Sequence, residues 1–249
     1  MIGNVAPALP STTRAAGTAP AAGTKRSDPR MPLRATDPDP GTLWLARSLW
    51  DSGAVQFGTF NIGTTIASPI YINARRLISN PRTLRRIGEL LTDETRTLTG
   101  MLHPHLAPFE LVAGVPLGGL HLATAFSLTA DIPLIYPNPK AREHEAYEEI
   151  EGAYFPGQTV LLVDDLITGG RSVLESAETL RSAGLMVHDA IVLLDRQGGG
   201  QAALDQAGIK LHPLLTIESL LNYLVARELI TQAQYARALT YISRVSGGG

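Results

Sequence analysis

Hydrophobic and polar residues follow two different spacings from about residue 109 to the end of the chain. Short apolar runs bounded by turn residues, such as 111–113 and 160–163, predict strands that are buried within a sheet. Apolar residues three or four positions apart, as in 120–128 and 173–184, predict helices between those strands. Strands that alternate with helices in this way predict an α/β fold with a doubly wound, mostly parallel sheet and flanking helices.

The same pattern adds elements on both sides of this unit. Upstream, it predicts a small N-terminal hood, made of a helix at 43–50 and strand-like sequence within 55–73, followed by a helix that starts at Asn80-Pro81. Within the unit and downstream, it predicts strands at 132–135, 186–194 and 209–214 and two final helices at 216–226 and 231–244.

The first forty residues differ in composition from the rest. They are rich in Ala, Pro, Gly and Thr and lack apolar periodicity, which predicts a disordered leader at 1–40 because such a segment buries too little surface to offset its ordering entropy. The whole chain has 249 residues, 44% of them hydrophobic and 18% charged, which is enough for one full-sized core. We therefore expect one domain at 41–245 and a flexible tail at 246–249.

Composition also limits the partners of the chain. A formal net charge of −2 leaves no overall footprint for nucleic acid, and the absence of cysteine excludes disulfides, thiolate zinc sites and thiol nucleophiles. No apolar run approaches the roughly 20 residues that cross a bilayer, and the N-terminus lacks the basic start and apolar stretch of a secretory signal. These features predict a cytoplasmic protein that binds neither nucleic acid nor membrane.

One segment, TVLLVDDLITGGRS at 159–172, combines the features of a ligand-binding turn. Asp164 and Asp165 follow the apolar run where the strand should end, and Gly169-Gly170 precede a helical pattern. Glycines let backbone N–H groups approach a phosphate, and carboxylates accept hydrogen bonds from sugar hydroxyls or help to hold a metal ion. Either feature alone also fits a helix cap or an ordinary turn. In this order, they predict a site for a phosphorylated sugar.

The segment resembles the phosphoribosyl-diphosphate (PRPP) motif of the type I phosphoribosyltransferases. Together with SPIYIN at 68–73 and AIVLLDRQGG at 190–199, it makes the chain resemble the orotate phosphoribosyltransferases over residues 43–245. The resemblance implies that Asp164 and Asp165 are catalytic and bind the ribose hydroxyls of PRPP. It also implies that the remaining contacts to PRPP come from Leu117, Gly118, Leu166, Ile167, Thr168, Gly169, Gly170, Arg171 and Ser172.

The resemblance further implies a reaction of de novo pyrimidine synthesis. Orotate and PRPP would give orotidine 5′-monophosphate and pyrophosphate, with Mg²⁺ as the cofactor. Thr168 and Arg196 would bind orotate, and a planar guanidinium suits a carboxylate because it can donate two parallel hydrogen bonds. The ion is expected to bind through PRPP without direct side-chain ligands, and a contact through water to Asp164 or Asp165 is left open. A homodimer that shares its catalytic loop between subunits is also implied.

The catalytic loop departs from the family pattern, which is close to R-K-x-x-K-x-H-G. The aligned positions hold Asn138, Pro139, Arg142, His144 and Glu145. A lysine of the family is also replaced by Gly63, and a lysine that is frequent in the pyrophosphate loop aligns with Gly118.

These replacements leave three interpretations open. In an active enzyme, Lys140, Arg142 and His144 would neutralise or protonate the departing pyrophosphate. The altered loop also fits a regulator or inactive paralogue that binds PRPP or a nucleotide. A third interpretation is a phosphoribosyltransferase for another base. Whether a decarboxylase is associated with the chain is open in all three.

Overall fold

The computed structural model describes residues 41–62, 65–139 and 148–246 of the chain. The predicted leader at 1–40, the catalytic-loop residues 140–147, Gly63 and the last three residues lie outside these ranges. Within the described ranges, every helix is too short or too polar to cross a bilayer.

A six-stranded sheet forms the centre of the molecule, with the strand order β5-β4-β3-β6-β7-β8. Neighbouring strands run parallel, except that β5 is antiparallel to β4. The strands are β3 (Leu111–Gly114), β4 (Leu134–Pro137), β5 (Ile150–Glu151), β6 (Thr159–Ile167), β7 (Met186–Asp195) and β8 (Lys210–Thr216). β3, β6 and β7 are mostly buried, which explains their long apolar runs. The predicted α/β fold with a mostly parallel sheet is confirmed.

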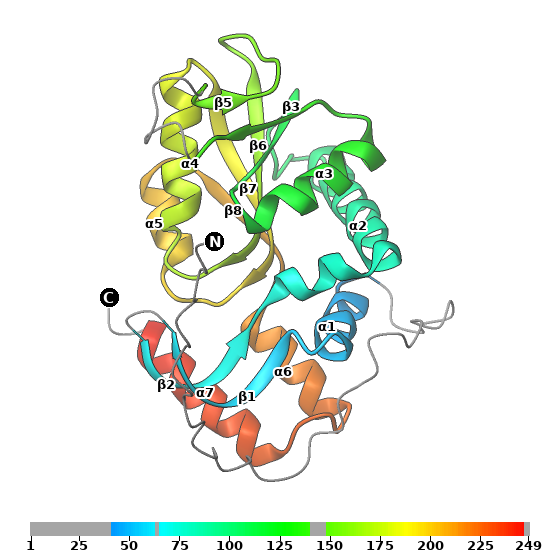
Figure 1. The fold of residues 1–249 in the computed structure, drawn as a ribbon, viewed down its shortest axis with the longest axis vertical. Helices are drawn as coiled ribbons and strands as arrows, with labels where there is room; N and C mark the ends of the chain where they lie inside the picture. The colour runs from blue at the N-terminus through cyan, green and yellow to red at the C-terminus, as the bar shows by residue number, and fades with distance from the viewer. Residues whose placement is uncertain (1–40, 63–64, 140–147, 247–249) are drawn as a thin grey trace, which may run out of the picture.

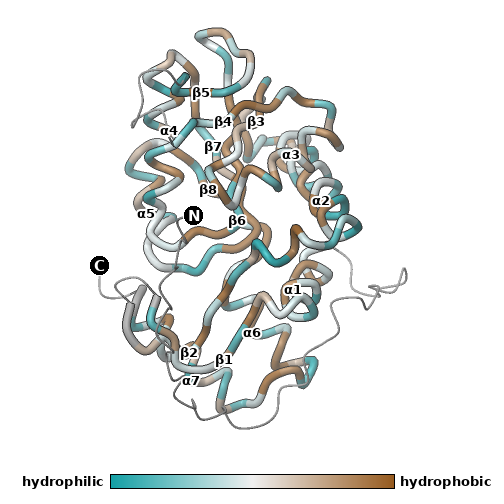
Figure 2. Tube along the Cα trace, in the orientation of Figure 1, coloured by the Kyte–Doolittle hydropathy of each residue, from teal (hydrophilic) through white to brown (hydrophobic). Residues whose placement is uncertain are grey.

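Helices cover both faces of this sheet, as Figure 1 shows. On one side lie α4 (Arg171–Ser182) and α5 (Gly200–Gln206), and on the other lie α2 (Pro81–Gly100) and α3 (Gly118–Ala130). Each side has its own core, with Leu180 and Leu204 on the first side and Ile87 and Phe126 on the second. In Figure 2 the strands carry mostly hydrophobic residues, while hydrophilic residues gather on the surrounding helices and connections.

A smaller layer lies below the sheet in Figure 1 and corresponds to the predicted hood. It contains α1 (Thr42–Asp51), the antiparallel hairpin of β1 (Val55–Ile62) and β2 (Thr65–Ile72), α6 (Ile217–Ala226) and α7 (Gln232–Ser246). The 3₁₀ helix η1 (Ala74–Ser79) leads from β2 towards α2. Ala74 and Leu77 of η1 are buried three positions apart, so Arg75 and Arg76 between them face outward.

β6 is longer than its apolar run predicts. The sequence places Asp164 and Asp165 after the end of this strand, but β6 continues to Ile167. It continues because Asp164, Leu166 and Ile167 still pair with residues of β7. The predicted strand end is therefore wrong: both acids lie in the last part of the strand, and the turn starts at Thr168.

Other boundaries differ for local reasons. β4 starts at Leu134, two residues later than the pattern predicts, and β5 is too short to produce a period in the polar stretch around it. The strand-like sequence at 55–73 forms two strands, and Pro69 is tolerated within β2 because this two-stranded sheet leaves β2 with a free edge. The helix predicted to start at Asn80-Pro81 is confirmed, since Oδ1 of Asn80 accepts hydrogen bonds from the N–H groups of Arg82 (3.0 Å) and Thr83 (3.3 Å).

Candidate active site

The carboxyl ends of β3 and β6 lie side by side where the strand order changes direction. From β3 the chain moves outward to β4, and from β6 it moves the opposite way to β7 and β8. Open α/β sheets bind their ligands at such a point. A cleft of about 240 Å³ opens here, lined by Ile72, Asn73, Ala74, Arg75, Pro116, Leu117, Gly118, Asp164, Asp165, Leu166 and Ser172.

The two adjacent acids, Asp164 and Asp165, both line this cleft. Asp164 is 7% exposed, and its Oδ1 accepts a hydrogen bond of 2.8 Å from the backbone N–H of Asp165. Burial raises the pKa of Asp164 well above its usual range, and the negative charge of Asp165 raises it further. Burial also raises the pKa of Asp165, while the charge of Arg75 acts in the opposite direction. Carboxylates in this setting gain from any ligand that brings hydroxyl donors or positive charge.

Two glycines allow the loop after β3 to lie directly against the acids. A β-carbon on Gly118 would stand 2.5 Å from Cγ of Asp165, and one on Gly119 would stand 2.9 Å from Cα of Asp164. The loop is held there by a hydrogen bond of 2.9 Å from the N–H of Val115 to the carbonyl of Val163, and it contains a cis peptide bond between Pro116 and Leu117. A side chain at 118 would displace either the loop or the carboxylate of Asp165, and a side chain at 119 would collide with the backbone of β6.

The turn after β6 has the geometry of an anion-binding turn. Gly170 adopts a φ of 81°, and a β-carbon there would stand 2.7 Å from Leu204, so only glycine fits this position without strain. α4 starts at the next residue, and its N-cap residue, Gly170, has no side chain to cap the first turn. Backbone N–H groups at an uncapped helix start, together with the helix dipole, favour a bound phosphate.

Thr168 and Arg196 lie on adjoining turns at the ends of β6 and β7. The N–H of Arg196 donates to the carbonyl of Ile167 (2.9 Å), and the N–H of Gly200 donates to the carbonyl of Thr168 (2.8 Å). The side chain of Arg196 is half-buried, and this burial lowers its pKa, whereas Tyr241 of α7 acts in the opposite direction. A partly desolvated guanidinium is well suited to pair with a carboxylate.

The predicted site residues thus divide into two groups. Leu117, Gly118, Asp164, Asp165, Leu166 and Ser172 line the cleft, whereas Ile167, Thr168, Gly169, Gly170, Arg171 and Arg196 lie beyond its lining. The side chain of Ile167 is buried in the core, so this residue can offer a ligand only its backbone. Arg171 projects into solvent, where its Nε lies 2.8 Å from Oε1 of Glu175.

Only the residues that flank the predicted catalytic loop lie within the described ranges. Lys140, Arg142 and His144 lie outside the described residues. Asn138, which stands at the first cationic position of the family pattern, donates from Nδ2 to Oε1 of Glu151 (2.9 Å), and its N–H donates to the carbonyl of Glu149 (2.8 Å). Asn138 therefore helps to hold β5 against β4.

Among the cleft residues that are not predicted from the sequence, Asn73 and Arg75 are the polar ones. Oδ1 of Asn73 is buried and has no hydrogen-bond partner among the described residues, which leaves an acceptor that a ligand hydroxyl could satisfy. Arg75 brings a positive charge to the same side of the cleft. The sequence signal that indicates them is a polar segment, 73–76, directly after the strand-like sequence at 70–72. The paired acids follow an apolar run in the same way.

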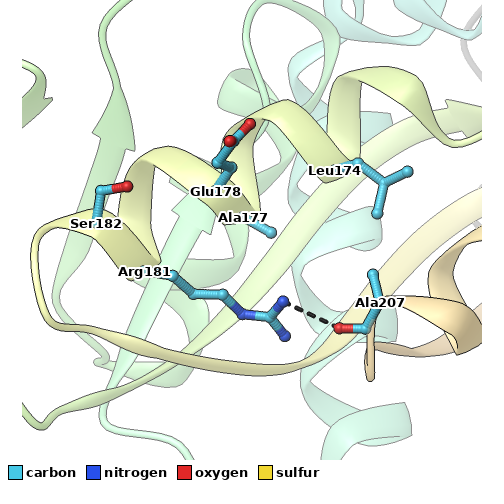
Figure 3. Close-up of a pocket in the computed structure, with 6 residues that line it drawn as sticks. All are labelled: Leu174, Ala177, Glu178, Arg181, Ser182 and Ala207. Carbon is cyan, nitrogen blue, oxygen red and sulfur yellow. Dashed lines mark hydrogen bonds between the residues drawn. The ribbon is translucent and has the colours of Figure 1, made fainter.

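A second hollow, of about 490 Å³, lies away from the acids between α4 and α5 (Figure 3). Its main cation, Arg181, donates to the carbonyls of Ala207 (3.0 Å) and Val187 (2.5 Å). These bonds tie α4 to α5 and β7, so we assign Arg181 a structural role.

The chain matches known proteins in sequence and in structure. The model of the phosphoribosyl transferase domain matches residues 76–207. An orotate phosphoribosyltransferase of Caenorhabditis elegans is 32% identical over 86% of this chain and 91% of the relative, and a uridine 5′-monophosphate synthase of Bos taurus is 35% identical over 80% of this chain. The solved orotate phosphoribosyltransferase of Aeropyrum pernix is 33% identical, with a TM-score of 0.60, over 72% of this chain and 98% of that structure.

These matches show that the chain belongs to the phosphoribosyltransferase family. Within this family, it groups by sequence with the type I members named orotate phosphoribosyltransferase. It spans only 40% of the length of the bovine synthase, so it is similar to one part of that longer protein.

Proposed function

We propose that the protein transfers the phosphoribosyl group of PRPP to orotate, giving orotidine 5′-monophosphate and pyrophosphate in pyrimidine synthesis. The observation that carries this proposal is the position of Asp164 and Asp165 at the switch point of the sheet, directly against the glycine loop at 114–119. Relatives of similar length carry the name of this activity.

The acids and the two loops have complementary tasks in this reaction. The ribose ring gains positive charge as pyrophosphate departs, so Asp164 and Asp165 stabilise it while they hold its hydroxyl groups. The turn at 168–172 and the start of α4 bind the 5′-phosphate through backbone N–H groups. The loop after β3 lies along the pyrophosphate, because Gly118 lets the backbone of this loop approach the acids in the cleft. Catalysis then rests on positioning and on charge stabilisation.

Orotate would bind next to the cleft, at the ends of β6 and β7. Arg196 pairs with its carboxylate, and Thr168 supplies a hydroxyl on the adjoining turn. The half-buried position of Arg196 favours this pairing, since a desolvated guanidinium has few competing waters.

Mg²⁺ is the proposed cofactor, and the donor set of the cleft fits it. The described residues contain no group of three or more His, Asp or Glu that could hold a metal ion, whereas the paired acids offer the hard oxygen atoms that Mg²⁺ prefers. The ion would therefore take most of its ligands from PRPP and water, near Asp164 and Asp165. When bound, it neutralises charge on the leaving pyrophosphate.

The catalytic loop leaves a second candidate function, a PRPP-binding regulator without turnover. The observation in its favour is that Asn138, at a position where the family has a cation, is engaged in the pairing of β4 with β5. For the active enzyme, we propose that Arg142 and Lys140 neutralise the pyrophosphate and that His144 donates a hydrogen bond or a proton to it. A homodimer and a cytoplasmic location complete the proposal.

A steady-state assay with the purified protein separates the two functions. The loss of orotate absorbance is followed in the presence of PRPP and Mg²⁺, and turnover on the order of 1 s⁻¹ or more is expected. Omitting PRPP is expected to abolish the reaction, and replacing orotate with adenine is expected to abolish the release of pyrophosphate, which is measured for both bases. Binding of PRPP by calorimetry without any turnover would favour the regulator, and an equal rate with adenine would contradict the choice of base.

A further inference from the structure

The positive charge of the cleft comes from an unexpected element. Among the cleft-lining residues of the described chain, Arg75 is the only cation, and it stands at the start of η1. The span matched by the phosphoribosyl transferase domain begins one residue later, at residue 76. The lysine positions of the family pattern in this region hold Gly63 and Gly118, neither of which carries a charge.

A side chain on Gly118 would collide with the carboxylate of Asp165. Its β-carbon would stand 2.5 Å from Cγ of Asp165. Any cation that serves this part of the cleft must therefore reach it from another element. η1 is such an element, because Asn73, Ala74 and Arg75 form the wall of the cleft together with Pro116 and Gly118.

The two adjacent arginines of η1 have different environments. Arg76 donates from Nε to the carbonyl of Ser52 (2.8 Å), so its guanidinium is engaged at the turn after α1. Arg75 is exposed and lines the cleft, where its charge acts on Asp165. Ala74 and Leu77 are buried and anchor η1 on either side of the two arginines. This packing fixes the directions in which Arg75 and Arg76 point.

We propose that Arg75 binds the diphosphate group of PRPP and takes the role of the lysines that this chain lacks. Arg75 lines the cleft together with the loop at 116–118, and a planar guanidinium can donate two parallel hydrogen bonds to a diphosphate. Arg75 balances Asp165 in the free protein and binds the anionic leaving group in the complex. This inference rests on the proposed function, because it takes PRPP as the ligand of the cleft.

Three ligands test the role of Arg75 by calorimetry: PRPP and inorganic pyrophosphate, each with Mg²⁺, and ribose 5-phosphate, which lacks the diphosphate. Arg75→Ala is expected to weaken PRPP and pyrophosphate by about 10- to 100-fold, the range of a lost charge-assisted hydrogen bond. Ribose 5-phosphate should bind within about twofold of the original protein, since its phosphate binds at α4. Arg75→Lys should restore part of the lost affinity because it keeps the charge.

The control is Arg85→Ala, which removes an equally exposed arginine from α2. It should leave all three affinities unchanged, and thermal unfolding of both variants should match the original protein. Equal pyrophosphate binding with and without Arg75 would overturn this inference and leave the proposed function standing. Failure of the original protein to bind either PRPP or pyrophosphate would overturn both. Equal weakening of ribose 5-phosphate would assign Arg75 to the site as a whole and overturn its link to the diphosphate.

Discussion

Gly118 lies so close to Asp165 that a β-carbon on residue 118 would stand 2.5 Å from the Cγ atom of the carboxylate. The contact joins the loop after β3 to the last part of β6, two segments whose strands pair in parallel. The missing side chain of glycine, at a position where a lysine is frequent in the family that the chain resembles, lets these two segments meet. The distance between loop and acid sets the shape of the cleft, so this contact is the first to test.

Gly118→Ala is expected to raise the dissociation constant of PRPP by about tenfold or more, because the added methyl group must displace either the loop or Asp165. Forcing extra volume into a packed site typically costs about 1–3 kcal/mol. Gly100→Ala is the control, since nothing lies within 4 Å of its β-carbon position. Calorimetry with PRPP and Mg²⁺ measures both. Unchanged binding by Gly118→Ala would mean that PRPP does not use this wall of the cleft.

Asp164→Asn is expected to stabilise the fold while it abolishes turnover. Burial raises the pKa of Asp164 in the folded protein, so the folded state holds the proton more tightly than the unfolded chain, and ionisation at neutral pH costs stability. Removing such a charge should add about 0.5–2 kcal/mol to the free energy of unfolding at pH 7.

The pH dependence gives the sign of this effect. Because the pKa is raised, the cost is absent at acidic pH and appears as the pH rises through the folded-state pKa. The advantage of Asp164→Asn in urea unfolding should therefore shrink as the pH is lowered from 7 towards 4. Asp93→Asn, at an exposed position of α2, is the control for the loss of one charge. An advantage that grows on acidification would contradict the assigned shift.

Arg196→Ala is expected to weaken orotate by about 10- to 100-fold while PRPP binds as before, because the residue lies beyond the cleft lining. Arg196→Lys should recover little, since a lysine cannot donate the two parallel hydrogen bonds that a guanidinium offers a carboxylate. Arg96→Ala on α2 is the control for charge. The KM for orotate and the dissociation constant of PRPP are measured for each variant. Loss of both affinities together would show that Arg196 supports the turn at 168–172 instead of the base.

The sequence predicts the main layers because the central strands β3, β6 and β7 contain apolar runs and longer helices such as α2 and α4 have an apolar face. The end of β6 cannot be predicted in this way. Asp164 continues the strand through backbone pairing with β7, and its polar side chain gives no sign of that pairing. The position of Arg75 in the cleft cannot be predicted for another reason. Its position depends on how η1 packs through Ala74 and Leu77, a tertiary contact that adjacent residues do not encode.

A buried hydrogen bond between two side chains joins β7 to β8, far from the paired acids along these strands. Nε2 of His212 lies 2.7 Å from Oδ1 of Asp189, both side chains are 8% exposed, and Oδ2 of Asp189 accepts from the N–H of Ala107 (3.1 Å). The carboxylate thus also anchors the connection that precedes β3. Removing one member of such a pair leaves the other group buried without its partner.

His212→Ala is expected to lower the free energy of unfolding by about 1–3 kcal/mol, because a buried carboxylate oxygen of Asp189 loses its hydrogen-bond partner. His188→Ala, at an exposed position of β7, should change it by less than about 0.5 kcal/mol. A double-mutant cycle with Asp189→Asn isolates the coupling between the two side chains, measured by urea unfolding at pH 7. PRPP affinity should persist in folded His212→Ala, because the pair lies near the amino ends of β7 and β8 and the cleft lies at the carboxyl ends of β3 and β6. A coupling energy near zero would assign the loss to packing of the imidazole ring, and the hydrogen bond between His212 and Asp189 would then have no net role in holding these strands together.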